Sequence, residues 1–116
     1  MENKYTVADM FAGVGGLSKA FQKAGAEIVW ANEFDRKACK IYIENFSAVC
    51  LVECDIKEVE AESIPSVDIL VGGFSGQSFS FSRQRSLFDD ERGNLFFEIL
   101  RILKVKKPRR LPFFVN

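Results

Sequence analysis

The chain has 116 residues, of which 47% are hydrophobic and 12 are phenylalanine, so it is long and apolar enough to bury the core of one domain. It contains no histidine, which excludes Ser-His-Asp and Cys-His catalysis and the commonest zinc-ligand combinations. No apolar run approaches the ~20 residues needed to cross a bilayer, and residues 1–4 lack the basic-then-apolar order of a signal peptide. We therefore expect a cytoplasmic protein with neither a membrane nor a metal as a partner.

The formal charges sum to zero but are divided unevenly along the chain. Residues 1–80 carry a net charge of −5, and residues 81–116 carry a net charge of +5. This polarity suits a protein that meets a polyanion with one side, and it suits a solvated basic tail nearly as well. Charge alone leaves both interpretations open.

Apolar runs and helical periodicities alternate along the chain. Strands are expected at residues 5–11, 27–31, 48–52 and 67–71. Helices are expected at residues 17–25, 38–46 and 95–103. Strands that alternate with helices favour an open, mostly parallel α/β sheet, in which ligands gather at the carboxyl ends of the strands.

Chemically active residues follow each predicted strand and should therefore meet at one edge of the sheet. They are the glycine turn at residues 12–16, Glu33, Asp55 and Gly73. The segment from Phe74 to Gly93 has no periodicity and predicts a long loop, and loops of that length in compact domains tend to be functional.

The first of these features has the properties of a nucleotide site. Gly13, Gly15 and Gly16 let the backbone approach a ligand closely, and the amino terminus of the following helix favours an anionic group. Glu33 lies 20 residues after Gly13, where a carboxylate accepts both hydroxyl protons of a ribose.

Three residues complete the predicted adenosine site. Asp55 is placed to accept a hydrogen bond from an adenine amino group, with Phe34 or Ile56 supplying a flat apolar face. These features leave the identity of the adenosine cofactor open. The dinucleotide fingerprint requires a third glycine where this chain has Ser18, which weighs against NAD.

The turn, read as Phe11-x-Gly13-x-Gly15, resembles the Phe-x-Gly-x-Gly motif of the DNA cytosine-C5 methyltransferases. Further segments look like the motifs of that family in order and spacing: Asp9 to Ser18, Asn32 to Asp35, Asp55-Ile56, Gly73 to Ser80, Arg92 to Phe97 and Lys107-Pro108. The resemblance covers nearly the whole chain. It implies a Rossmann-like fold of the S-adenosylmethionine-dependent methyltransferases, and a role in DNA methylation and bacterial restriction-modification.

The resemblance also implies the cofactor and the residues that bind it. The cofactor is S-adenosylmethionine or its product S-adenosylhomocysteine. The implied binding residues are Asp9, Phe11, Gly13, Gly15, Gly16, Glu33, Phe34, Asp55, Ile56 and Gly73.

The resemblance fails at the catalytic residue. Where the family carries a proline and a nucleophilic cysteine, this chain has Ser75 and Gly76. In the family, a thiolate adds to C6 of a cytosine flipped out of the duplex, so that C5 attacks the sulfonium methyl group. Glycine has no side chain for that addition, while Gln77 and Ser78 remain as hydrogen-bonding groups of the pocket. We therefore expect this chain to be catalytically inactive.

The segment 81–92 corresponds to the family's mobile loop, which closes over double-stranded DNA. The resemblance implies DNA contacts from Ser80, Ser82, Arg83, Arg85 and Arg92. Arginines in such a loop contact phosphates. A solvated loop whose arginines are neutralised by the acidic residues 89–91 is the alternative interpretation.

The last segment, residues 109–116, departs from the family pattern. No glutamate precedes Asn116, and Pro112 argues against a central strand there. In the family a Glu-Asn pair, an Arg-x-Arg motif, a target-recognition domain and a closing helix follow. We therefore expect residues 1–116 to be the truncated amino-terminal part of the catalytic domain, partnered by a missing carboxyl-terminal portion or a second chain.

Two other functions stay open from the sequence. One is a non-enzymatic module, derived from such an enzyme, that binds DNA or a partner subunit. The other is an NAD-type Rossmann domain, which the missing glycine and the later motifs oppose. Cys39, Cys50 and Cys54 are expected to be buried thiols rather than metal ligands.

Overall fold

The protein is seen in a computed structural model that describes residues 4–74, 91–108 and 113–115. Five strands form one sheet in the order β3-β2-β1-β4-β5, and each adjacent pair is parallel. The strands are β1 (Thr6–Met10), β2 (Glu27–Glu33), β3 (Cys50–Glu53), β4 (Ile69–Phe74) and β5 (Phe113–Val115). The strand order reverses direction beside β1, as in doubly wound α/β sheets, so the expected fold class is confirmed.

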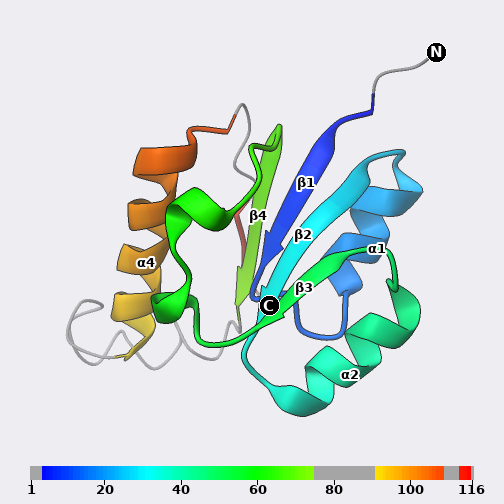
Figure 1. Cartoon of the computed structure of the whole chain (residues 1–116), viewed down its shortest axis with the longest axis horizontal. Helices are drawn as coiled ribbons and strands as arrows, with labels where there is room; N and C mark the ends of the chain where they lie inside the picture. Colours follow the sequence, from blue (N-terminus) through cyan, green and yellow to red (C-terminus); the bar gives the residue numbers. More distant parts are fainter. Residues whose placement is uncertain (1–3, 75–90, 109–112, 116) are drawn as a thin grey trace.

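The helices cover both faces of the sheet. They are α1 (Gly16–Lys23), α2 (Arg36–Asn45) and α4 (Glu91–Lys106), with two short 3-10 turns, η1 (Ile56–Glu58) and η2 (Ala61–Ser63). α1 and α2 lie on one face, whereas α4, η1 and η2 lie on the other (Figure 1).

The core follows the alternation of side chains along the strands. Ala8 and Met10 of β1 point towards the α4 side, where they share a cluster with Ile99 and Ile102. Val7 of β1 points to the opposite face and packs in a cluster that includes residues of α1. Both faces of β1 are therefore buried, as expected for the central strand of a parallel sheet.

One polar contact joins β1 and β4 at their amino-terminal ends. The carboxylate of Asp68 accepts a hydrogen bond from the backbone N–H of Thr6 at 2.9 Å, and the backbone N–H of Asp68 donates to the Thr6 hydroxyl at 3.1 Å. This contact closes the amino-terminal edge between the two strands. The carboxyl ends of the same strands lead into the glycine turn and into Gly73.

One expected boundary, the end of the long loop, is wrong. The long loop was expected to reach Gly93, but α4 begins at Glu91, so Arg92 lies in a helix. A glutamate at the first position of a helix complements the helix dipole and so favours a helix start there. The prediction relied on the spacing of apolar residues, which does not include this signal. The expectation that Pro112 does not lie inside a central strand is not contradicted, because β5 begins at Phe113, after Pro112, and pairs with Gly72–Phe74 at the edge of the described sheet.

Candidate cofactor site

The glycine turn joins β1 to α1 through left-handed backbone. Phe11, Gly13 and Gly15 have φ angles of 57°, 60° and 105°. For Phe11 this conformation is unfavourable, on the order of 1–3 kcal/mol, and such strain concentrates at ligand sites. The backbone N–H of Gly15 donates to the carbonyl of Ala12 at 3.0 Å, which closes the turn.

The three turn glycines have different surroundings. A Cβ atom added to Gly13 or Gly16 would have no heavy atom within 4 Å, so the backbone there is open to a ligand. A Cβ atom added to Gly15 would lie 3.2 Å from the ring of Tyr42, and closer still to the ring of Phe46. Gly13 and Gly16 therefore fit the predicted role, whereas the Cβ side of Gly15 faces the protein interior.

The carboxylate of Glu33 connects the turn to the end of β2. One oxygen, Oε1, accepts a hydrogen bond from the backbone N–H of Gly13 at 2.8 Å. The other, Oε2, accepts one from the backbone N–H of Asp35 at 2.8 Å. Each oxygen keeps a lone pair for a further donor, so the carboxylate is oriented and still able to accept from a diol.

Phe34 and Asp35 follow Glu33 and begin the next helix. The Phe34 side chain is 71% exposed, so its ring is available to stack on a flat ligand. Asp35 caps α2, because its carboxylate accepts from the backbone N–H of Ala38 at 2.9 Å. The predicted stacking residue and the helix cap are thus adjacent.

A residue outside the predicted set, Asn32, fixes the end of β3 beside β2. Its side-chain amide is buried and donates to the carbonyls of Val52 and Cys54, at 2.9 and 3.0 Å. The sequence signal for this role was the Asn-Glu pair at the end of a strand. The contact places Asp55 at the same edge as Glu33.

Asp55 and Ile56 form the first turn after β3. The carboxylate of Asp55 accepts from the backbone N–H of Lys57 at 3.0 Å, and residue 55 caps η1. The Ile56 side chain is 2% exposed and packs in the core, so of the two residues predicted to supply an apolar face, Phe34 is the exposed one. An isoleucine beside a polar loop residue is buried because η1 turns its side chain towards α4.

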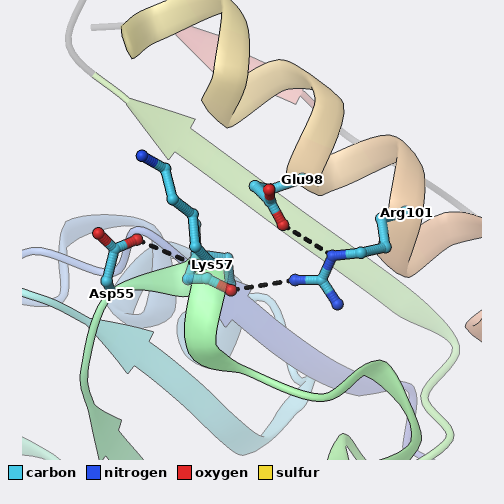
Figure 2. Close-up of polar contacts among 5 residues, drawn as sticks. Asp55, Lys57, Glu98 and Arg101 are labelled. Atoms are coloured by element: carbon cyan, nitrogen blue, oxygen red, sulfur yellow. Dashed lines mark hydrogen bonds and ion pairs between the residues drawn. The ribbon is translucent and has the colours of Figure 1, made fainter.

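α4 contacts this turn directly (Figure 2). Arg101 donates from Nη2 to the carbonyl of Ile56 at 3.1 Å, and from Nε to the Glu98 carboxylate at 2.7 Å. The Arg101 side chain is 38% exposed. Arg101 therefore joins α4 to the first turn after β3.

Asp9 is enclosed by the protein in this structure, and its role in cofactor binding stays a prediction. Its side chain is fully buried, and Oδ2 accepts a hydrogen bond from the Ser18 hydroxyl at 2.6 Å. Burial raises the pKa of the Asp9 carboxyl from 3.8 to about 6, and the charge of Glu33 also raises it, while the Ser18 hydrogen bonds oppose the rise. On β1, Asp9 shares the face of Val7, which packs towards α1.

Other predicted residues fall at the same edge or outside the described part of the chain. Gly73 lies in β4 next to Gly72, which pairs with Met10, so it is beside the turn. The backbone of Arg92 lies in α4. The following lie outside the described residues: Gly76, Gln77, Ser78, Ser80, Ser82, Arg83 and Arg85.

The three cysteines are free thiols in different surroundings. Cys39 is buried, and burial raises the pKa of its thiol to about 11. Burial also raises the pKa of Cys54. Cys50 is exposed, which corrects the expectation that all three are buried.

Within residues 4–74, 91–108 and 113–115, no group of three acidic, cysteine or histidine residues is arranged to hold a metal ion.

Two hollows, of about 360 and 480 Å³, lie at the opposite edge of the sheet. Both are lined by Lys4, Gly25 and Ala26, and none of the predicted site residues lines them. These two hollows are therefore separate from the candidate site at the carboxyl edge. In the described part of the chain, no helix is long and apolar enough to cross a bilayer.

Comparison with known sequences shows the family of the chain. The family model for the C-5 cytosine-specific DNA methylases matches residues 5–113. The Type II methyltransferase M.HhaI of Haemophilus parahaemolyticus is 46% identical over 101 residues, covering 87% of this chain and 30% of that protein. The Type II methyltransferase M.Bsp6I of Bacillus sp. (strain RFL6) is 43% identical over 105 residues, covering 89% of this chain and 33% of that protein. The chain thus spans about a third of the length of these relatives.

Solved structures show the same fold. A protein described as a DNA modification methyltransferase encoded within an E. coli prophage superposes with a TM-score of 0.75 and 28% identity, covering 94% of this chain and 32% of that one. The S. pombe Dnmt2 methyltransferase superposes with a TM-score of 0.64 and 19% identity, covering 97% of this chain and 33% of that one. The second likeness concerns the fold alone.

Proposed function

Because the chain belongs to the C-5 cytosine-specific DNA methylase family, we propose that it binds S-adenosylmethionine or S-adenosylhomocysteine at the carboxyl edge of β1, β2 and β3. It would act as the cofactor-binding, amino-terminal part of a DNA (cytosine-5)-methyltransferase of the cytoplasm. The family match does not favour an NAD-type domain. It does not favour a module unrelated to methyl transfer either.

The observation that carries the proposal is the double contact of Glu33. Its two oxygens are held by the backbone N–H groups of Gly13 and Asp35, both at 2.8 Å. A carboxylate oriented in this way presents its remaining lone pairs to the two hydroxyl groups of a ribose. The ribose site and the glycine turn are therefore one connected unit.

The rest of the edge fits the other parts of the cofactor. The open space on the Cβ sides of Gly13 and Gly16 leaves room for the methionine part against the backbone. The exposed ring of Phe34 is available to the adenine face, and the Asp55 carboxylate to the adenine amino group. When bound, S-adenosylmethionine supplies an electrophilic methyl group.

The second part of the proposal is that this chain does not transfer that methyl group. Cytosine C5 becomes nucleophilic enough only after a thiolate adds to C6, and Gly76 supplies no thiol. The described thiols do not replace it: burial raises the pKa values of Cys39 and Cys54, and Cys50 lies at the amino-terminal end of β3, away from the carboxyl edge. Transfer of labelled methyl groups to DNA by the unmodified chain would overturn this part.

Double-stranded DNA is the proposed partner, with Ser80, Ser82, Arg83, Arg85 and Arg92 as the contacting residues. The +5 charge of residues 81–116 supports this assignment. We expect weak, sequence-independent binding whose affinity falls with salt according to the few phosphates engaged. A missing carboxyl-terminal portion or second chain is proposed to supply recognition, since the chain spans only a third of its relatives.

Isothermal titration of the chain with S-adenosylhomocysteine tests the cofactor assignment. We expect a dissociation constant of tens of micromolar or weaker, about −6 kcal/mol, and no binding of NAD. Glu33→Ala should weaken binding at least about tenfold, because it removes the ribose acceptor and releases the turn. Glu27→Ala, an exposed acid at the opposite end of β2, is the matched control and should bind normally. Absence of binding by the unmodified chain would refute the proposal.

A further inference from the structure

A buried polar chain passes beneath the glycine turn and links three elements. Ser18 of α1 donates to the carboxylate of Asp9 on β1 at 2.6 Å, and the Ser18 hydroxyl lies 2.8 Å from the hydroxyl of Tyr42 on α2. All three side chains are 0–1% exposed. Such networks are costly to leave incomplete, because the interior has a low dielectric constant.

The direction of these hydrogen bonds follows from the donors available. A serine hydroxyl has one proton, and an ionised carboxylate accepts only. Ser18 gives its proton to Asp9, so the hydroxyl of Tyr42 must donate to Ser18. Burial raises the pKa of Tyr42 to about 12, which keeps its proton in place at neutral pH.

The same side of α2 also limits the turn by contact. Tyr42 and Phe46 are one helical turn apart, with ring centroids separated by 4.7 Å. A Cβ atom on Gly15 would overlap the Phe46 ring and would lie 3.2 Å from the Tyr42 ring. The two aromatic rings therefore pack against the glycine turn at Gly15. The hydroxyl of Tyr42 is hydrogen-bonded to Ser18 in the first turn of α1.

The start of α2 is joined to the ribose-binding carboxylate. Glu33 accepts from the backbone N–H of Asp35, the residue that caps α2. The thiol of Cys39 in α2 also lies 3.3 Å from the backbone carbonyl of Glu33, to which it donates. α2 therefore contacts both halves of the proposed site without forming part of its open surface.

We propose that Tyr42 is a positioning residue of the cofactor site, which holds the glycine turn in its binding conformation through Ser18 and Asp9. The proposal rests on the cofactor function argued above and extends it to a residue that does not touch the cofactor. α2 then determines cofactor affinity from behind the turn.

The test compares Tyr42→Phe with Tyr5→Phe, since Tyr5 is 53% exposed. Tyr42→Phe keeps the ring that packs on Gly15 and removes only the hydroxyl. We expect it to weaken S-adenosylhomocysteine binding about fivefold to tenfold, and Tyr5→Phe to leave binding unchanged. Unchanged affinity in Tyr42→Phe, with or without a loss of thermal stability, would overturn the proposal.

Two NMR readouts on the unliganded chain separate this proposal from the cofactor assignment. Tyr42→Phe should shift the amide resonances of Gly13 and Gly15, and it should raise the pKa of the Asp9 carboxyl, because Ser18 loses the donor that polarises it. Ser18→Ala should raise the Asp9 pKa further and is a second variant if Tyr42→Phe folds poorly. Glu33, whose charge also raises the Asp9 pKa, is unchanged in both variants. Unmoved glycine amides would contradict the positioning role even if the unmodified chain failed to bind cofactor.

Discussion

The two faces of the sheet hold the functional edge by different means. On the α1 and α2 face, Asp9, Ser18 and Tyr42 are joined by hydrogen bonds that are fully buried. On the α4 face, Arg101 holds the carbonyl of Ile56 through a side chain that is 38% exposed. One face uses a buried polar network, in which Oδ1 of Asp9 has no hydrogen-bond partner, and the other uses a contact that water reaches.

This difference determines how each face should respond to change. An ionised carboxylate kept from water is sensitive to pH and to the loss of any partner. An exposed ion pair is screened by water and salt and contributes little. We therefore expect large effects beneath the glycine turn and small ones at Arg101.

The largest effect should come from adding a methyl group to Gly15. Gly15→Ala places a Cβ against the ring of Phe46 at a φ of 105°, which combines overpacking with left-handed strain. We expect a loss of unfolding free energy on the order of 3 kcal/mol, measured by urea denaturation.

Gly16→Ala is the matched control for this substitution. Its Cβ would have no neighbour within 4 Å, so the unfolding free energy should change by less than about 1 kcal/mol. Equal losses in the two variants would show that α2 does not restrict the turn.

The second effect concerns pH. Folded Asp9 keeps its proton up to about pH 6, whereas the ordinary carboxyl loses it near 3.8, so the folded state binds more protons between these values. The stability that Asp9 contributes is thus fully present below pH 3.8 and is lost as the pH rises to about 6. The shift corresponds to on the order of 3 kcal/mol.

Asp9→Asn isolates this contribution, because asparagine does not titrate. The unfolding free energy of the unmodified chain minus that of Asp9→Asn should decrease as pH rises from 4 to 7, measured by urea denaturation at each pH. A difference that stays constant over this range would mean that the buried carboxyl has an ordinary pKa.

The smallest effect is expected on the α4 face. Arg101→Ala removes the contacts to Glu98 and to the Ile56 carbonyl, and we expect a loss of roughly 0.5–1 kcal/mol that diminishes in high salt. Lys104→Ala, an exposed residue of the same helix, should have no effect and serves as the control. A salt-independent loss above about 2 kcal/mol for Arg101→Ala would contradict the difference between the two faces, because it would mean that the Arg101 contact contributes as much as the buried network.

The sequence by itself determined the architecture and the edge of the sheet at which the candidate site residues lie. Alternating strands and helices predicted the parallel sheet, and glycine or acidic residues after the strands predicted the edge at which Gly13, Glu33 and Asp55 lie. These features are local, because a left-handed turn favours glycine and a buried strand favours apolar residues whatever the tertiary contacts of the rest of the chain. The functional family was likewise carried by short motifs, and the match over residues 5–113 confirms it.

Only the tertiary structure decided which of those residues are open at the edge of the sheet and which face the core. Asp9 and Ile56 belong to family motifs, yet both are buried, because the neighbours that cover them come from α1 and α4. Gly15 must be small because of Phe46, which lies 31 positions later in the chain. The proposed role of Tyr42 follows from a similar long-range contact. The spacing of residues within one element cannot predict such a contact, because packing depends on residues that meet only after folding.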